Sequence, residues 1–555
     1  MSNEIEFKLL APNNKAVSLI GSFSDWNEIP MEKDDKGYYR TSVKLDDGAY
    51  EYKFRVQSNS WTHQPDEWVE IDDPYARELH PDSCNSVIRI KDGQRIVDDY
   101  VWTHDDKPLP ANNQLIIYEL FISDFSSGDE NCSAKGQYEA VIEKLDYLCG
   151  LGINAIELMP VNAAPEDASW GYLPSFFFAP NPKYGSTKDL KRFIDTCHGC
   201  GIRVILDQLY NHSSDHSPLL AIDRDYWYYH DRHHPDRPED YWGPEFNYET
   251  YDERYDRHPA WELMGDVVRY WIEEYHIDGI RFDAVKEIDN PEFMNWVCQQ
   301  TKLAASMKPF YNIGERIPDT PEVVRPEGAL DACWRETFYY FLTPHLKGEE
   351  EIDIQRAKEL LDPTQHDYPD RTTGAVHYLS SHDRPRLLDS LKEQGFSEDD
   401  AFQRIKLGAV MLMTAVGVPM ILMGEEFGEV NSMTPNSPHP LDWSLIERDR
   451  NADLLTYYRK LFALRRQFSS LQNSNIDFFH EDADNQVLAY QRWNEESCVV
   501  VVLNLKNMEC DHYHVHNIPQ GHVWHDWLQD TPVELHDDQL ICSLRGYEAR
   551  VYILR

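Results

Sequence analysis

The chain contains 555 residues, of which 41% are hydrophobic, and its 97 Asp and Glu against 53 Lys and Arg give a formal net charge of −44. The length indicates several domains or one large barrel with additions, and the hydrophobic fraction suffices for a sizeable core. The negative charge argues against nucleic-acid and anionic-membrane partners, because both would repel an acidic protein. A neutral polyol substrate fits this surface, and 15 Trp and 32 Tyr supply aromatic rings on which sugars can stack.

The N-terminus, the cysteines and the longest apolar run indicate the compartment. "MSNEIEFKLLAP" lacks a basic region followed by an apolar one, so we expect no secretory signal. Ten cysteines are no disulfide framework; Cys197 and Cys200 have C-x-x-C spacing, but no second pair completes a zinc set, so we interpret them as buried thiols. Residues 408–424 are broken by Gly417 and Pro419, which favours a buried helix and a core strand over a membrane span. We therefore expect a cytoplasmic protein with no membrane partner.

Residues 1–105 have the pattern of a separate β-sandwich. Hydrophobic and polar residues alternate in "IEFKLLAP", "AVSLIGSF", "YYRTSVKL" and "YEYKFRV", which indicates short antiparallel strands. Trp26, Trp61 and Trp68 are candidates for stacking on glucose rings. The alternative is that they fill the core of the sandwich or its contact with the next domain. The stretch "GSFSDWN", followed by "GAYEYKFRV", resembles the starch-binding modules of carbohydrate-binding family 48.

From residue 114 to residue 467, strand-like and helix-like segments alternate. The strands that we expect are "LIIYEL", "AIELMP", "RVILDQ", "GIRFD", "YNIGE", a short one near "LDACW", "VHYLS" and "PMILMG". Helical runs such as "YEAVIEKLDYLCGLG" lie between them. This α/β alternation predicts a (β/α)8 barrel with its chemistry on the loops that follow the strands. Residues 470–555 alternate again and predict a C-terminal antiparallel β domain.

Carboxylates, an arginine and histidines stand at the ends of four of these strands. The motifs are D-x-x-x-N-H (Asp207, Asn211, His212), G-x-R-x-D-x-x-K (Gly279, Arg281, Asp283, Lys286), a lone Glu315 after an apolar strand, and H-D (His382, Asp383). Active sites of barrel enzymes lie at such strand ends. Taken alone, Arg281 and Asp283 could equally form a buried ion pair that steadies the strand. Four motifs in this order are a stronger signal, and over essentially its whole length the chain resembles the α-amylase superfamily, glycoside hydrolase family 13.

The resemblance implies a retaining glycosidase. Asp283 is then the nucleophile, Glu315 the general acid/base, and Asp383 the residue that holds sugar hydroxyls and stabilises the transition state. Double displacement requires two of the carboxyl groups to lie about 5–5.5 Å apart. We expect Arg281 to keep Asp283 ionised, and the charges of Asp283 and Asp383 to raise the pKa of Glu315.

The same resemblance assigns the residues that bind the sugar. Tyr172 in "SWGYLP" is expected to stack on it, and His212 and His382 to bind hydroxyls in the subsite at the cleaved bond. Lys286 is expected to face the leaving-group side. A core tyrosine and a solvated lysine are the alternatives for the first and last of these.

Other positions are expected to support the site. Asp207 is expected to hold Arg281 rather than to touch the chemistry. Asn211 matches a position that binds structural calcium in many α-amylases, so calcium is possible, although no cofactor is required. The long aromatic-rich segment 213–259 after the third strand is expected to form a small inserted domain that walls the cleft. Its His230, His233 and His234 lack a defined metal-ligand spacing.

We expect hydrolysis of α-1,4 bonds within starch- or glycogen-type α-glucans and maltooligosaccharides. The alternatives are a 1,4-α-glucan branching enzyme, of which Ser381 is more typical, and a maltooligosyltrehalose trehalohydrolase. The stretches "MGEEFGE" and "LDW" (residues 441–443) resemble both of these groups. Lys286 and the "NH" of the first motif are more typical of amylases, and the third motif lacks the paired acids common in the other two groups. A catalytically silent glucan-binding protein is the alternative from a different class, against which the three retained carboxylates argue. Protein partners, product length, tolerance of α-1,6 branch points and oligomeric state do not follow from the sequence.

Overall fold

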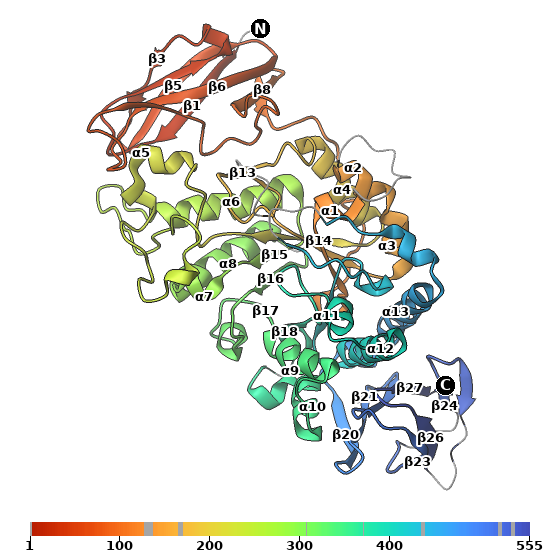
Figure 1. Cartoon of the computed structure of the whole chain (residues 1–555). Helices are drawn as coiled ribbons and strands as arrows, with labels where there is room; N and C mark the ends of the chain where they lie inside the picture. The colour runs from red at the N-terminus through yellow and green to blue at the C-terminus, as the bar shows by residue number, and fades with distance from the viewer. Residues whose placement is uncertain are drawn as a thin grey trace.

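The computed structural model of the chain describes residues 3–126, 137–164, 170–306, 308–369, 371–434, 439–519, 524–533, 535 and 539–554. It divides into three regions along an elongated molecule (Figure 1). A β region lies at one end, an α/β barrel occupies the middle, and a second β region carries the C-terminus at the opposite end.

The N-terminal region is a sandwich of two sheets, as the alternating pattern predicts. One sheet has the order β1-β5-β4, and the other β3-β2-β6-β8-β9, with β7 also paired to β6. The inner faces supply a core that includes Phe7, Leu19 and Phe54. The strands are β1 (Asn3–Leu10), β2 (Val17–Gly21), β3 (Ile29–Pro30), β4 (Glu32–Lys33), β5 (Tyr38–Leu45), β6 (Gly48–Gln57), β7 (Trp68–Ile71), β8 (Ser86–Lys91) and β9 (Gln94–Ile96).

The three candidate tryptophans of this region lie on its surface. Trp26, Trp61 and Trp68 are 42%, 53% and 38% exposed, so they do not fill the sandwich core. Trp61 lies at the contact with the barrel insertion, where its Nε1–H donates to Asp225 at 3.0 Å. Glucan binding by these rings stays a prediction.

The central region is a closed barrel of parallel strands, in agreement with the predicted fold class. Eight of the described strands form it, and each predicted strand is present. In order around the barrel they are β10 (Ile117–Leu120), β11 (Ala155–Leu158), β14 (Arg203–Gln208), β15 (Gly279–Phe282), β16 (Tyr311–Gly314), β17 (Ala332–Trp334), β18 (Ala375–His377) and β19 (Val418–Leu422).

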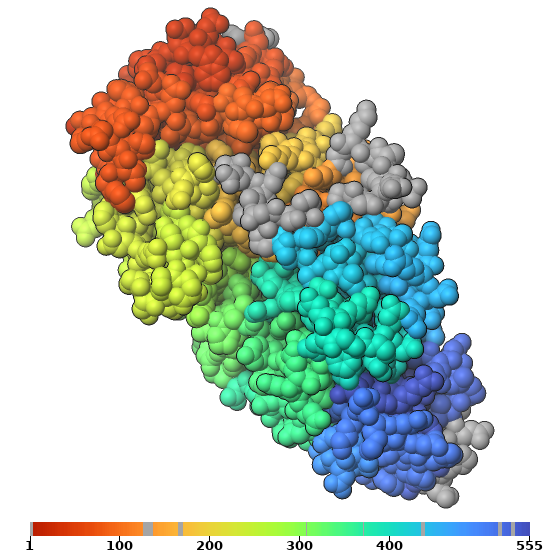
Figure 2. All heavy atoms as spheres, viewed as in Figure 1, coloured from red at the N-terminus to blue at the C-terminus, as the bar shows by residue number. Residues whose placement is uncertain are grey.

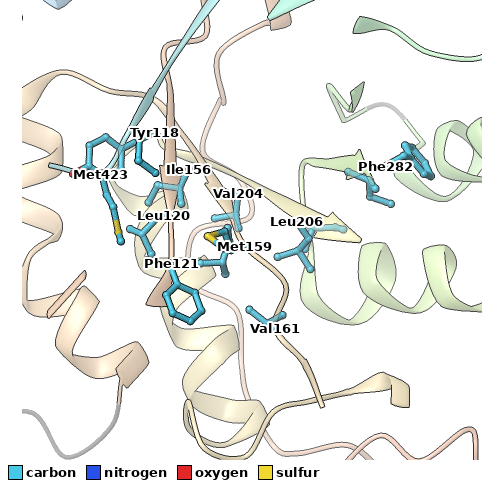
Figure 3. Packing of buried hydrophobic residues seen from close by; sticks show 14 of the residues in the cluster. Tyr118, Leu120, Phe121, Ile156, Met159, Val161, Val204, Leu206, Phe282 and Met423 are labelled. Atoms are coloured by element: carbon cyan, nitrogen blue, oxygen red, sulfur yellow. The ribbon is translucent and has the colours of Figure 1, made fainter. Parts of the chain in front are cut away.

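Helices surround this barrel and cover the outer faces of its strands. The outward side chains pack between strand and helix, as Tyr118, Leu120, Ile156, Val204 and Leu206 show (Figure 3). The helices of this region are α1 (Ile122–Ser126), α2 (Gln137–Glu143), α3 (Leu145–Leu151), α4 (Thr187–Gly199), α6 (Pro259–Tyr275), α7 (Val285–Ile288), α8 (Pro291–Ala305), α9 (Glu336–Lys347), α10 (Ile354–Leu361), α11 (Leu387–Glu393), α12 (Glu398–Thr414) and α13 (Asp449–Gln467).

The barrel interior changes from apolar to charged along the strands. Ile117, Ala155 and Ile205 belong to an interior core that also contains Tyr311, Trp334 and Met420. Because side chains two residues apart share a face of a strand, the next interior positions are Glu119, Glu157 and Asp207. These acids are buried. The carboxyl ends of three neighbouring strands therefore present acids inside the barrel, directly below the loops.

Gly279 allows two of the strands to approach closely. A Cβ at this position would lie 2.7 Å from the carbonyl oxygen of Tyr311 and 3.0 Å from a side-chain carbon of Ile205. Any side chain would therefore push β15 away from β14 and β16, and Arg281 with it.

The segment after the third barrel strand forms the expected excursion and meets the N-terminal region. It contains α5 (Pro218–Trp227), and the carbonyl oxygen of Ile222 accepts hydrogen bonds from the side chain of Asn14 and the backbone N–H of Asn59, both at 2.9 Å. In the space-filling view the N-terminal region rests directly on this part of the chain (Figure 2). A two-stranded sheet of β12 (Asn162–Ala163) and β13 (Phe176–Pro180) lies in the preceding loop.

The C-terminal region consists of antiparallel strands in two sheets, ordered β20-β21-β22-β27-β24-β25 and β23-β26. The strands are β20 (Ile476–Asp482), β21 (Val487–Trp493), β22 (Cys498–Asn504), β23 (Cys510–Val515), β24 (Trp524–Asp526), β25 (Thr531–Val533), β26 (Leu540–Leu544) and β27 (Ala549–Leu554).

The fold shows where the apolar run 408–424 and the C-x-x-C cysteines, Cys197 and Cys200, lie. The apolar run 408–424 forms the end of the buried helix α12 and the barrel strand β19, as expected, and in the described part of the chain no helix is long and apolar enough to cross a membrane. Cys197 is buried, but Cys200 is exposed because it caps the C-terminal end of α4, so the interpretation of both as buried thiols is wrong for Cys200.

Candidate active site

A cavity of about 590 Å³ opens at the carboxyl ends of the barrel strands and contains the three predicted carboxylates. Asp283 and Glu315 each directly follow the last residue of a strand, β15 and β16. Asp383 lies in the loop after β18. The lining residues are Trp170, Tyr172, Leu173, His212, Tyr241, Trp242, Asp283, Ala284, Glu315, His382 and Asp383.

Arg281 is the cation at the base of this cavity. Its Nη1 donates to Asp283 Oδ1 at 2.6 Å and to both carboxylate oxygens of Asp207 at 2.9 and 3.0 Å, and its Nη2 lies 3.7 Å from Glu315 Oε2. The guanidinium is fully buried and packs 4.4 Å from the ring of Trp334. One arginine thus connects carboxylates from three neighbouring strands and fixes where they lie relative to each other.

The turn after β15 holds Glu315 in place. Ala284 adopts a left-handed conformation (φ 50°), which few non-glycine residues do, and its N–H donates to Glu315 Oε2 at 2.7 Å. The backbone N–H of Val285 donates to the carbonyl oxygen of Glu315 at 2.9 Å. The segment that carries Asp283 therefore also positions the other carboxylate.

Burial shifts the protonation of both acids in the same direction. It raises the pKa of Asp283 to about 6, although Arg281 opposes the shift, and the neighbouring Asp207 and Asp383 add to it. Burial also raises the pKa of Glu315, with contributions from Asp283 and Asp383 and opposition from Arg281. Arg281 thus acts in the expected direction by lowering the pKa of Asp283, but the desolvation of this carboxylate is the larger effect.

Asp383 lies beside a different partner. Its Oδ2 is 3.2 Å from Nε2 of His382, and its side chain is 48% exposed to the cavity. Burial would raise its pKa, but the charge and hydrogen bond of His382, together with Arg281, outweigh burial and lower the pKa to about 2. The cavity thus contains one fully ionised carboxylate and two that bind protons more readily.

Tyr172 and His212 form one wall of the cavity. The Tyr172 ring stacks on the ring of His382 at 5.0 Å, and its hydroxyl donates to Asp207 at 2.6 Å. His212 Nε2–H donates to the carbonyl oxygen of Tyr172 at 2.9 Å, and its Nδ1 lies 3.3 Å from Nδ2 of Asn211. Burial lowers the pKa of His212 to about 4, so the ring is neutral at pH 7. Contact of either ring with a sugar stays a prediction.

Lys286 and Asn211 lie outside the central cavity. Lys286 lines a second, smaller cavity of about 300 Å³ between the loops after β15 and β16, and its Nζ is 3.7 Å from Glu287 Oε1. Asn211 is buried, and its backbone carbonyl oxygen accepts a hydrogen bond from the backbone N–H of Phe246 at 2.9 Å. Among the described residues no group of three or more His, Cys, Asp or Glu is arranged to hold a metal ion. Calcium at Asn211 stays a prediction.

Several residues of the site were not identified from the sequence. Tyr241 and Trp242 come from the insertion, where aromatic residues are so frequent that none stands out, and Trp170 precedes the predicted tyrosine by two positions. Glu119 accepts the Nδ1–H of His382 at 2.6 Å and its backbone N–H at 3.1 Å. Its signal was present: a glutamate inside the apolar run "LIIYEL", two residues after the interior residue Ile117.

Comparisons with protein-family profiles match all three regions of the chain. The profile "Alpha amylase, catalytic domain" matches residues 119–453, more than half of the chain. "Carbohydrate-binding module 48 (Isoamylase N-terminal domain)" matches residues 1–76, and "Alpha amylase, C-terminal all-beta domain" matches residues 479–545.

Individual relatives have low sequence identity to this chain. The chain is 25% identical over 539 residues to a malto-oligosyltrehalose trehalohydrolase of Saccharolobus solfataricus, covering 85% of this chain and 87% of the relative. It is 28% identical over 523 residues to a pullulanase of Bacillus subtilis (83% and 69%) and 25% identical over 534 residues to a 1,4-alpha-glucan branching enzyme of Pseudoalteromonas atlantica (88% and 70%).

Solved structures agree on the fold. The crystal structure of pullulanase type I from Bacillus subtilis complexed with maltose superposes with a TM-score of 0.83 at 22% identity, covering 100% of this chain and 84% of the other. A putative alpha amylase from Salmonella typhimurium superposes with a TM-score of 0.76 at 20% identity, covering 100% and 98%. With the catalytic-domain profile over more than half of its length, the chain belongs to the α-amylase family, glycoside hydrolase family 13, as an enzyme that acts on α-glucans.

Proposed function

We propose that the protein is a retaining hydrolase that cleaves α-1,4 bonds within starch- or glycogen-type α-glucans and maltooligosaccharides. The observation that supports it is the convergence of Asp283, Glu315 and Asp383 on one open cavity whose walls carry Trp170, Tyr172 and Trp242. Acids in contact with aromatic rings are the combination that a glucosyl unit requires, because the rings stack on its apolar faces while the acids act at its anomeric carbon.

The first step uses the two acids that Arg281 connects. Arg281 binds Asp283 through Oδ1, so Oδ2 is the oxygen available to attack the anomeric carbon. Glu315, whose pKa is raised, donates its proton to the glycosidic oxygen, and the chain beyond the cleaved bond leaves as an alcohol. The product is a glucosyl ester on Asp283, and Glu315 is now ionised.

The second step reverses the roles. Glu315 removes a proton from water, the water oxygen attacks the anomeric carbon, and the ester bond to Asp283 breaks. Asp383, fully ionised beside His382, accepts hydrogen bonds from sugar hydroxyls in both steps and stabilises the positive charge of the transition state. Two inversions at one carbon retain its configuration, so the first product should have the α-anomeric form.

Incubation with amylose tests the proposal. Hydrolysis within the chain predicts a rise in reducing ends together with a rapid loss of iodine colour, and NMR of the first product should show the α-anomer. Asp283→Asn is the matched control, since it removes the nucleophilic charge and keeps the shape of the side chain. Absence of new reducing ends from every α-glucan tested would contradict the proposal, and a β-anomeric product would contradict the double displacement.

A branching transglycosylase is the second candidate. It is supported by Ser381 before His382 and by the similarity to 1,4-alpha-glucan branching enzymes. The same glucosyl ester would then be resolved by a sugar hydroxyl rather than by water. Loss of iodine colour with few new reducing ends would favour this candidate. Assays with pullulan and with a trehalose-capped maltooligosaccharide extend the test to the activities that two other relatives carry in their names.

A further inference from the structure

A buried glutamate below the cavity is not used by the steps described above. Glu119 is 1% exposed and stands at the carboxyl end of β10. Both of its carboxylate oxygens face His382: Oε1 accepts the ring Nδ1–H at 2.6 Å, and Oε2 accepts the backbone N–H at 3.1 Å. Such a two-point contact fixes the rotation of the imidazole as well as the position of its main chain.

His382 stands between this glutamate and Asp383. Its other ring nitrogen, Nε2, is 3.2 Å from Asp383 Oδ2. The ring is held in plane by Tyr172, which stacks on it at 5.0 Å with an interplanar angle of 14°, and by Trp170, which meets it edge-on at 5.6 Å. Glu119, His382 and Asp383 therefore form one line of hydrogen-bonding groups from the barrel interior to the cavity.

We propose that Glu119 is a positioning residue of the glucan-cleaving site: by accepting the Nδ1–H of His382 it keeps this ring protonated and directs its Nε2–H at Asp383. This inference rests on the proposed function, because it gives Glu119 its role through Asp383. Without a negative charge at Nδ1, the ring would be free to lose a proton, and in one neutral tautomer Nε2 would present a lone pair to the carboxylate.

The charges around His382 support this arrangement. Burial disfavours the imidazolium, but the charges of Asp383 and Glu119 and their hydrogen bonds outweigh burial and hold the pKa of His382 well above its usual range. Two other charged groups lie nearby: Asp207 interacts favourably with a protonated His382, whereas Arg281 is a further cation on the Asp383 side. Glu157 would add to the attraction only in its ionised form, which burial disfavours. Among the described residues, Glu119 and Asp383 are the carboxylates that contact the nitrogens of the ring.

Glu157 offers a matched control. It is the β-ladder partner of Glu119 on β11 and is equally buried, at 1% exposure, but neither of its carboxylate oxygens has a hydrogen-bond partner among the described residues. Burial and the charge of Glu119 raise the pKa of Glu157 well above the usual range, which favours its neutral form. Glu157→Gln changes a buried acid of the same shape that makes no hydrogen bond to His382, whereas Glu119→Gln changes the carboxylate that accepts from its ring.

The first experiment measures kcat for the wild type, Glu119→Gln, Glu119→Asp and Glu157→Gln on amylose as a function of pH. The ratio of wild-type to Glu119→Gln kcat cancels the titration of Asp283 and Glu315, which both enzymes share. This ratio should rise by about tenfold or more as the pH passes through the range in which His382 of the variant loses its proton, because loss of a neighbouring opposite charge lowers a pKa by about 1–3 units. Glu119→Asp, which keeps the charge, and Glu157→Gln should give flat ratios.

The second experiment does not need activity. The short Nδ1–H hydrogen bond should give a far-downfield imidazole proton resonance that is absent from His382→Gln, and with labelled histidine the ring nitrogen shifts report its protonation. We expect the His382 ring to stay protonated to a higher pH in the wild type than in Glu119→Gln, with the two titrations separated by about 1–3 pH units.

The outcomes separate the two proposals. A flat wild-type to Glu119→Gln ratio, or a His382 ring whose protonation is unchanged by Glu119→Gln, would overturn the positioning role while leaving hydrolysis intact. A wild type without cleavage of any α-glucan would overturn the proposed function, and the imidazole resonances would still decide whether Glu119 keeps His382 protonated.

Discussion

Two aspartates of one cavity have pKa values that are shifted in opposite directions. Asp283, beside Arg281, has its pKa raised to about 6, and Asp383, beside His382, has its pKa lowered to about 2. Each carboxylate contacts a cation, which is Arg281 for Asp283 and His382 for Asp383. The difference arises because Arg281 divides its charge between Asp283 and the fully buried Asp207, while the Asp383 side chain is 48% exposed and its histidine contact is supported by Glu119. A cation nearby is therefore not sufficient to lower the pKa of a carboxylate; desolvation and the sharing of that cation decide the direction of the shift.

The largest expected effect comes from replacing the proposed nucleophile, the carboxylate of Asp283. Asp283→Asn should lower kcat on amylose by about 10⁴-fold or more, because loss of a nucleophile removes the covalent route altogether. Reducing-end assays measure it, with circular dichroism as the control for folding. Wild-type-like cleavage by this variant would show that the nucleophile is misassigned.

Removal of the charge of Asp383 should lower the activity less than the loss of Asp283 does. Asp383→Asn should lower kcat/KM by about 10²–10³-fold, the usual effect of losing one group that stabilises transition-state charge. Both kcat and KM should change, because this carboxylate also binds hydroxyls of the ground-state sugar. If Asp383→Asn lost as much activity as Asp283→Asn, with KM unchanged, the proposed division of roles would be wrong.

The two carboxylates should also separate in their pH dependence. Asp283 must be ionised, so kcat/KM of the wild type should fall tenfold per pH unit as the pH drops below about 6, whereas Asp383 stays ionised down to about pH 2. His382→Gln removes the cation that lowers the pKa of Asp383, which should then rise by about 1–3 units. The acid limb of this variant should therefore steepen below about pH 5, toward a hundredfold per unit. An unchanged slope would mean that His382 does not control Asp383.

The smallest expected effect lies outside the central cavity, in the same motif as Asp283. Lys286→Ala should leave kcat on short maltooligosaccharides within about twofold, and raise KM for long glucans by about three- to tenfold, the loss of one partly exposed polar contact. Kinetics on a series of chain lengths measure this. A large loss of kcat on short substrates would place Lys286 among the residues that act at the cleaved bond.

The fold followed from the sequence because its signals are local. Strands such as "RVILDQ" and "GIRFD" are apolar runs of strand length, and the helices between them have helical periodicity, so the barrel order could be predicted segment by segment. The exposure of the three tryptophans could not be predicted in this way. Trp68 lies on β7, and periodicity alone does not state which face of a strand is buried, while Trp26 and Trp61 lie in turns, where there is no periodicity to interpret.

For the site, the sequence by itself determined which chemical groups stand at strand ends: Asp207, Arg281, Asp283, Glu315 and the pair His382 and Asp383. Only the tertiary structure decided how their protons are held, since that depends on desolvation and on groups far apart in the chain. Glu119 and His382 are separated by 263 positions in the chain, yet they are hydrogen-bonded beside Asp383. Residue types are set by the chain, but electrostatics inside a closed barrel are set by which strands end next to one another.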